Sequence, residues 1–224
     1  MGALAARCGD PNSSPAGTPP VASASPSVAS PTPSSTPSPT RSATPSSTPS
    51  STPSATNPKP WYEDYDPAQF AAQVRKYAAQ AGIRPQLLMA ILYNESYKPH
   101  DPELERSWAK IDSDPAFGIA NMHRPAFDDT KRGRPFAKRK WEELPDDPAL
   151  AIQAAAWHLH DLAERLPSKR STTLTEDELL ALGYNAGGGN MRAFARGAEP
   201  GSQARSYLDR LHENWGKSAE AVRT

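Results

Sequence analysis

The sequence predicts an all-α domain behind an N-terminal tail, and three observations support this. After position 60, apolar residues recur at the helical spacing of three and four. Two of these periodic segments begin with Asp-Pro, a pair typical of helix N-termini. No stretch alternates apolar and polar residues as a half-buried strand does. We therefore expect residues 61–224 to form one domain built of helices, or nearly so.

The tail, residues 1–60, contains 14 of the 25 prolines, no aromatic residue and a single acid, Asp10. Residues 13–56 are mainly Ser, Thr, Pro and Ala with repeated Ser-Thr-Pro-Ser units. Such a segment has too little apolar surface to form a core, so we expect it to be disordered. In the polyproline II form it would reach on the order of 100 Å. Two interpretations are open, an extended O-glycosylated tether or a disordered terminus without a further role.

The first predicted helix starts at Asp66-Pro67, where Asp caps the helix and Pro occupies its first turn, and Gly82 stops it. Its apolar residues fall on one face, namely Phe70, Val74, Tyr77 and Ala81.

The second predicted helix follows Pro85 and places Leu88, Ile91 and Glu95 on a single face. An acid at a helix end is ordinarily a solvated charge. If this face is buried, however, desolvation disfavours the carboxylate and raises the pKa of Glu95. A general acid working near neutral pH needs such a shift, which makes Glu95 a candidate catalytic residue.

Residues 99–145 contain many prolines and no long periodic run, which predicts an irregular region with short helices. A long core helix is expected to start at Asp147-Pro148. Its apolar residues alternate steps of three and four: Ile152, Ala155, Leu159, Leu162 and Leu166.

Two further helices are expected in the last third of the chain. The capping box at residues 175–178 opens one that runs into Tyr184, and the Gly-rich residues 185–189 break it. The last periodic segment places four residues on one side, namely Tyr207, Leu208, Leu211 and Trp215.

Composition argues against several kinds of partner. The predicted domain has 22 basic and 24 acidic residues, which gives no electrostatic footprint for nucleic acid. No apolar run reaches 18 residues, so no membrane-spanning helix is expected. The five histidines form no His-Glu-x-x-His pattern and no cysteine cluster exists, so we expect neither a metal nor another cofactor.

Cys8 is the single cysteine, which excludes an internal disulfide. A lone Cys followed by low complexity resembles the lipid-modified start of a bacterial lipoprotein, although Arg7 stands where that signal has a small residue. The apolar residues 2–6 are too few for a signal peptide. Two interpretations are open: a membrane lipid anchor through Cys8, or an unmodified thiol behind a truncated or mis-assigned start.

Four short motifs follow one another along the predicted domain. They are Glu95-Ser96, Gly118-Ile119-Ala120-Asn121, Tyr184-Asn185-Ala186-Gly187 and Tyr207-Leu208. Taken alone, a Gly-rich break is an ordinary helix stop. In this order, and with a long helix between the second and third motifs, residues 66–215 resemble the soluble lytic transglycosylase (SLT) domain in its actinobacterial secreted or lipoprotein type.

This resemblance implies a lysozyme-like fold of the kind shared by goose-type lysozymes and lytic transglycosylases. It implies an enzyme that cleaves the β-1,4 bond between N-acetylmuramic acid (MurNAc) and N-acetylglucosamine (GlcNAc) in peptidoglycan and leaves 1,6-anhydroMurNAc ends. We expect a monomer that acts on glycan strands outside the cytoplasm, secreted or associated with the cell wall or membrane. The tail would then be a wall-spanning linker.

The family's motifs also assign roles to single residues. Glu95 matches the family's single catalytic acid and base, and Tyr184 matches the tyrosine that helps to position it. Asn121 stands where the family usually has Gln after Gly-Leu-Met, and Ala120 replaces the Met. The residues expected to bind substrate are Ser96, Gly118, Asn121, Asn185 and Tyr207.

Three functions are compatible with these motifs: a lytic transglycosylase, a hydrolytic muramidase on the same fold, and a non-catalytic wall-binding module. Glu95 in its motif argues against the module. A carboxylate across the cleft from Glu95 would favour the muramidase, and Asp112 and Asp114 are the nearest candidates in sequence. Substrate-assisted glycosidases need a single acid, because the sugar's N-acetyl oxygen stabilises the cation. One Glu with Asn185 at the N-acetyl group therefore favours the transglycosylase.

Overall fold

The computed structural model describes residues 60–223, and every structural statement below concerns these residues. Cys8 and nearly all of the predicted tail lie outside this range. The elements in chain order are η1 (Pro67–Phe70), α1 (Ala71–Ala81), α2 (Pro85–Glu95), α3 (Pro102–Trp108), β1 (Ala116–Phe117), β2 (Met122–His123), α4 (Arg124–Thr130), η2 (Trp141–Glu143), α5 (Pro148–Glu164), α6 (Glu176–Ala195) and α7 (Ser202–Ala221). The prediction of an almost wholly helical fold is confirmed. Among the described helices, none is both long and apolar enough to cross a membrane.

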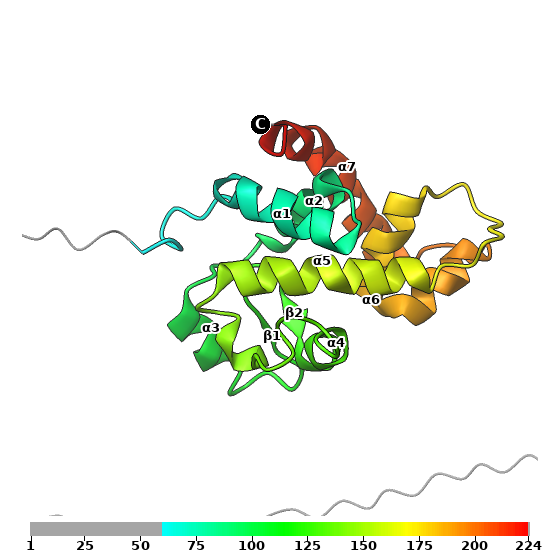
Figure 1. Cartoon of the computed structure of the whole chain (residues 1–224). Helices are drawn as coiled ribbons and strands as arrows, with labels where there is room; N and C mark the ends of the chain where they lie inside the picture. Colours follow the sequence, from blue (N-terminus) through cyan, green and yellow to red (C-terminus); the bar gives the residue numbers. More distant parts are fainter. Residues whose placement is uncertain (1–59, 224) are drawn as a thin grey trace, which may run out of the picture. The chain divides into compact units, whose positions relative to one another are not determined.

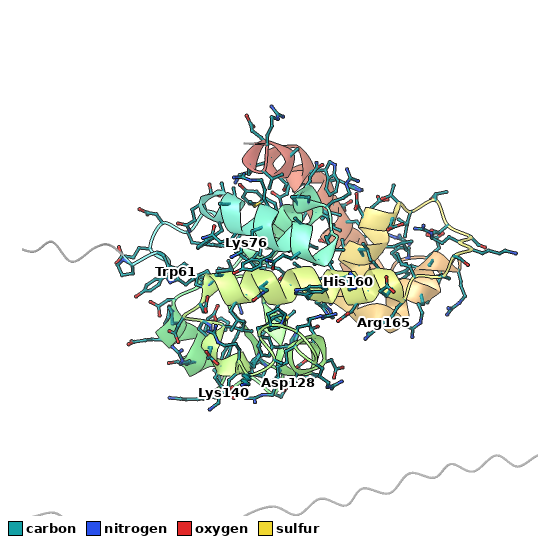
Figure 2. All side chains as sticks on the ribbon, viewed as in Figure 1. Trp61, Lys76, Asp128, Lys140, His160 and Arg165 are labelled. Atoms are coloured by element: carbon teal, nitrogen blue, oxygen red, sulfur yellow. The ribbon has the colours of Figure 1, made fainter. Side chains whose placement is uncertain are left out.

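Helix α5 is the central element of the fold. Figure 1 shows α1 and α2 on one side of α5, and α3, the hairpin and α4 on the other. Figure 2 shows Lys76 of α1 and, across α5 from it, Asp128 and Lys140. The apolar face of α5 is fully buried at all predicted positions but one. The exception is Leu166, which lies beyond the end of α5 because Pro167 disfavours helical backbone at the residue before it.

Helix α2 is buried on all sides, since every residue from Leu87 to Glu95 is buried. It contacts α1, α5, α6 and α7. The single apolar face expected from the sequence was therefore too narrow a description, because a helix surrounded by other helices needs no polar face. This position places Glu95 inside the domain, at the C-terminal end of α2.

The first predicted helix is confirmed as η1 followed by α1. Asp66 caps η1 by accepting a hydrogen bond from the Ala68 amide at 3.0 Å. Gly82 ends α1 with φ 67°, a left-handed conformation that Gly adopts without a steric penalty.

The irregular region contains the short helices expected there, and also a hairpin that the sequence did not reveal. Strands β1 and β2 pair antiparallel, with Phe117 opposite Met122. Two residues per strand are too few to produce a recognisable alternation. The connecting turn bends through Gly118 (φ 72°) and Asn121 (φ 43°), and Asn is among the residues that tolerate a left-handed backbone.

The Gly-rich segment interrupts α6, as predicted. Gly187 has non-helical angles (φ 85°, ψ 155°), and α6 consists of two helical segments on either side of it, the second of which runs to Ala195 and was not predicted. Met191 and Phe194 beyond the kink are buried, so tertiary packing holds the second half of the helix in place. The predicted capping box at Thr175 and Glu178 is present. In α7, Tyr207, Leu208 and Leu211 are buried as predicted, and Trp215 packs against the core.

Candidate active site

Glu95 is buried, with 8% of its surface exposed, and both oxygens of its carboxylate accept a hydrogen bond. The hydroxyl of Tyr207, from α7, donates to Oε1 at 2.9 Å. The side-chain amide of Asn121, from the hairpin turn, donates to Oε2 at 3.1 Å and to the main-chain oxygen of Glu95 at 2.9 Å. Three segments far apart in the sequence therefore meet at one carboxyl group.

Burial raises the pKa of Glu95 above its ordinary value of 4.5. The hydrogen bonds from Asn121 and Tyr207 and the charges of Lys98 and Arg210 act in the opposite direction, but burial is the larger effect. A raised pKa keeps more of the protonated form near neutral pH. The condition set for Glu95 from the sequence, that its helical face be buried, is met in the structure.

Tyr207 contacts Glu95 directly, and Tyr184 does not. The Tyr184 hydroxyl donates to the main-chain oxygen of Ala120 at 2.7 Å, so it supports the turn that carries Asn121. Burial first and then the charge of Glu95 raise the pKa of both tyrosines well above the ordinary value, so both hydroxyls stay protonated. Tyr184 was expected to help to position Glu95; the tyrosine whose hydroxyl contacts the carboxyl group is Tyr207.

The Tyr207 contact had one sequence signal. A tyrosine on the buried face of a predicted helix needs a partner for its hydroxyl group. That partner lies 112 positions away, so the periodicity alone could not identify it.

Asn121 is placed as a neighbour of Glu95, whereas the sequence suggested a glycan contact. Its amide nitrogen makes both hydrogen bonds to Glu95, while its Oδ1 is buried and has no partner within residues 60–223. The two contacts to Glu95 fix the amide orientation, as expected for a residue that positions an acid.

Gly118, predicted to bind substrate, is buried and lies in the turn between β1 and β2. Its amide donates to Oε2 of Glu105 at 2.7 Å, and Oε1 of Glu105 contacts Nδ1 of His100 at 2.9 Å. A Cβ atom on Gly118 would lie 2.8 Å from the main-chain oxygen of Leu144. His100 and Glu105 were not singled out as site residues, because no local pattern links them to this turn.

A second pair of amides ties the end of α2 to α7. Asn94 donates to the main-chain oxygen of Tyr207 at 3.1 Å, and Asn214 donates to Oδ1 of Asn94 at 3.0 Å. These bonds fix the distance between Glu95 and the Tyr207 hydroxyl. Sequence reasoning missed both residues, since a buried Asn next to an acid has no distinctive spacing.

Ser96 and Asn185 lie at the edge of the site. The Ser96 hydroxyl donates to the main-chain oxygen of Tyr93 at 2.8 Å and is half-buried. Asn185 is exposed and lines a groove of about 850 Å³ between the kink of α6 and the N-terminal half of α7. Arg210 lines the same groove. The groove is therefore lined both by Asn185, a predicted substrate-binding residue, and by Arg210, whose charge acts on Glu95.

Neither Asp112 nor Asp114 contacts Glu95. Both are exposed, and Oδ1 of Asp114 lies 3.1 Å from Nδ1 of His123. Among residues 60–223, the charged groups that shift the pKa of Glu95 are Lys98 and Arg210, both cations. The arrangement thus consists of one carboxyl group held by two hydrogen-bond donors. This carboxyl group can give and take a proton.

The family model described as the transglycosylase SLT domain matches residues 72–207, about three-fifths of the chain. The chain belongs to the SLT family. The match confirms the resemblance to the SLT domain and includes the first three motifs and Tyr207 of the fourth. No curated protein matches the sequence. The SLT domain gives the protein a lysozyme-like fold and a lytic transglycosylase type of activity on peptidoglycan, a polymer of the extracytoplasmic wall.

Proposed function

We propose that this SLT protein cleaves the β-1,4 bond between MurNAc and GlcNAc with Glu95 as its single acid and base, and that it releases 1,6-anhydroMurNAc ends. The observation that carries the proposal is the environment of Glu95. Its carboxyl group is buried and held by two neutral donors, and the charges that act on it come from Lys98 and Arg210. Within residues 60–223, neither hydrogen-bond partner of the Glu95 carboxyl group is an acid, and the two candidates for a second carboxylate, Asp112 and Asp114, are exposed.

In the first step, protonated Glu95 gives its proton to the oxygen that bridges MurNAc C1 and GlcNAc C4. The bond from C1 to this oxygen breaks, and GlcNAc leaves as an alcohol. The carbonyl oxygen of the MurNAc acetamido group bonds to C1 and takes up the positive charge. Asn185 lines the same groove as Arg210, whose charge acts on Glu95, and is assigned to hold this acetamido group.

In the second step, the MurNAc C6 hydroxyl attacks C1 and Glu95 takes the proton of that hydroxyl. The new bond between O6 and C1 displaces the acetamido oxygen, and the anhydro ring closes. Glu95 is again protonated. The attacking hydroxyl is already tethered, and well-oriented intramolecular reactions reach effective molarities of about 10⁵ M or more. The hydrogen bonds from Tyr207 and Asn121 stabilise the carboxylate between the two steps.

Digestion of purified cell wall in heavy-oxygen water tests the proposal. A transglycosylase incorporates no label, because the new bond at C1 is made with O6 of the same sugar. Mass spectrometry of the muropeptides should show unlabelled 1,6-anhydro ends. Products labelled at the reducing end would overturn the transferase mechanism and place the protein among the muramidases.

The assignment of Glu95 is tested by Glu95→Gln, which keeps the shape of the side chain but cannot donate the required proton. We expect no turnover, with an unchanged far-ultraviolet circular dichroism spectrum. Glu103→Gln is the matched control, because Glu103 is an exposed acid of α3. Digestion by Glu95→Gln near the parent rate would remove Glu95 from the mechanism.

We infer further that residues 1–60 form a linker that holds the catalytic domain, residues 61–224, within the wall. The low content of apolar residues in this segment supports the inference. The mass of the N-terminal peptide from protein made in a bacterial host with a cell envelope separates a lipid-modified Cys8 from an unmodified thiol.

A further inference from the structure

The groove lined by Asn185 and Arg210 is polar, and among the described residues that line it none is acidic. Its polar lining consists of Asn185, Asn190, Ser202, Gln203, Ser206 and Arg210. At about 850 Å³ it has room for a sugar residue and a substituent. Uncharged amides and hydroxyls would suffice to bind a neutral sugar. The single cation among them indicates that the ligand also carries a negative charge.

Arg210 is available for such a charge. It is exposed, and within residues 60–223 no carboxylate lies at ion-pair distance from it. Arg134 and Arg139, in contrast, each pair with acids of the domain. Arg210 instead donates to the Ser206 hydroxyl at 3.3 Å, and its guanidinium lies 5.6 Å from the centre of the Tyr207 ring. These contacts hold the side chain over the groove and leave further guanidinium donors unused.

Arg210 also lies close to the reacting centre. It is three residues after Tyr207 on α7, and Tyr207 donates to Glu95. Its positive charge lowers the pKa of both Glu95 and Tyr97. An anion bound by Arg210 would therefore belong to a sugar next to the bond that Glu95 cleaves.

We propose that this groove binds a carboxylate carried by the MurNAc residue, with Arg210 as the recognising cation. The inference rests on the proposed function. MurNAc differs from GlcNAc by a lactyl ether on O3. The lactyl carboxyl group is free when the glycan is stripped of peptide, and it is amide-linked to a stem peptide with carboxylates of its own when it is not. A guanidinium binds either carboxylate through two parallel hydrogen bonds. Arg210 thereby distinguishes MurNAc-containing strands from chitin-like ones.

Binding measurements on the inactive Glu95→Gln protein test this inference without turnover. Three soluble ligands of equal sugar number are titrated by calorimetry: glycan with stem peptides, glycan stripped by an amidase, and a chitooligosaccharide, which has no carboxylate. Adding Arg210→Gln should weaken the binding of at least one MurNAc ligand about tenfold, the effect of losing a charge-assisted hydrogen bond. The chitooligosaccharide should change less than about twofold, because it presents no anion to the guanidinium.

Arg205→Gln is the matched control, since Arg205 is an exposed arginine of the same helix outside the groove lining. It should change none of the three affinities. A loss confined to the stripped glycan identifies the lactyl carboxylate, and a loss confined to the peptide-bearing glycan identifies the stem. Equal losses for all three ligands, or none, would overturn the inference and leave the proposed function standing. Failure of the Glu95→Gln protein to bind any MurNAc ligand would count against the proposed function itself.

Discussion

Replacing Tyr207 by Phe removes one of the two hydrogen bonds to the Glu95 carboxyl group. The ring of Tyr207 is buried, so Phe fills the same space, and the change removes only the hydroxyl that donates to Oε1 of Glu95 at 2.9 Å. This bond favours the charged form of Glu95, so its loss raises the pKa of Glu95 further. A hydrogen bond to a charged group contributes about 1.5–3 kcal/mol, which corresponds to about one to two pKa units.

The pH dependence of kcat/KM measures this shift. Cleavage needs protonated Glu95, so activity falls as pH rises through the pKa of Glu95 in the free enzyme. In Tyr207→Phe this alkaline limb should move upward by about one to two pH units. The maximal rate should fall about tenfold or more, because the carboxylate formed after the first step loses a donor worth about 1.5–3 kcal/mol.

Tyr184→Phe is the matched control for this experiment. It also removes a buried tyrosine hydroxyl, but one that donates to the main-chain oxygen of Ala120. We expect a modest loss of stability, about 1 kcal/mol, and an unmoved alkaline limb. A shift of the limb in Tyr184→Phe without one in Tyr207→Phe would refute the reasoning and return the positioning role to Tyr184.

Three further outcomes are expected. The pKa of Glu95 is raised on folding, so the protonated carboxyl group stabilises the folded state at low pH, and this contribution is lost as pH rises above about 4.5 toward the raised value. The melting temperature of Glu95→Gln minus that of the parent should therefore increase from pH 4 to pH 8. A constant difference would contradict the shift. Gly118→Ala adds a Cβ 2.8 Å from a main-chain oxygen at φ 72° and should lower the free energy of unfolding by about 3 kcal/mol or more. Gly82→Ala, at φ 67° with no described atom within 4 Å of the new Cβ, should lower it by about 1 kcal/mol. Thermal unfolding compares the two variants, and equal losses would show that the turn adjusts to the added Cβ. Deletion of residues 1–60 should change the melting temperature by less than about 2 °C and leave the activity on soluble glycan unchanged, since this segment has little apolar surface to pack. A larger drop in the melting temperature would indicate that the segment packs against the domain.

The long helices could be predicted because their burial follows directly from spacing. Helix α5 has an Asp-Pro start and one apolar face, and it is the central helix of the fold. Helix α7 was predicted through Tyr207 and Leu211 in the same way. The break at Gly187 was predicted from its glycines, but the helical segment that follows it was not, since glycine content does not show whether packing holds a helix beyond the break.

The partners of Glu95 could not be derived from spacing. Asn121 and Tyr207 lie 26 and 112 positions from Glu95, and hydrogen bonds at such separations depend on how the helices pack. The motif order drew attention to both residues, yet it assigned them to the substrate. Position within a motif therefore singled out residues that meet in the structure, and the tertiary structure was needed to separate those that contact Glu95 from those that line the groove.

The two donors on Glu95 differ in a way that suits an acid that must become a base. The amide nitrogen of Asn121 can only donate a hydrogen bond. Its second hydrogen bond, to the Glu95 main-chain oxygen, fixes the orientation of the amide, so Oε2 of Glu95 is held as an acceptor. The Tyr207 hydroxyl can donate or accept. It can therefore stay in contact with Oε1 whether or not the carboxyl group carries its proton. In the proposed mechanism, Asn121 would set the orientation of the carboxyl group, and Tyr207 would accommodate its change of charge.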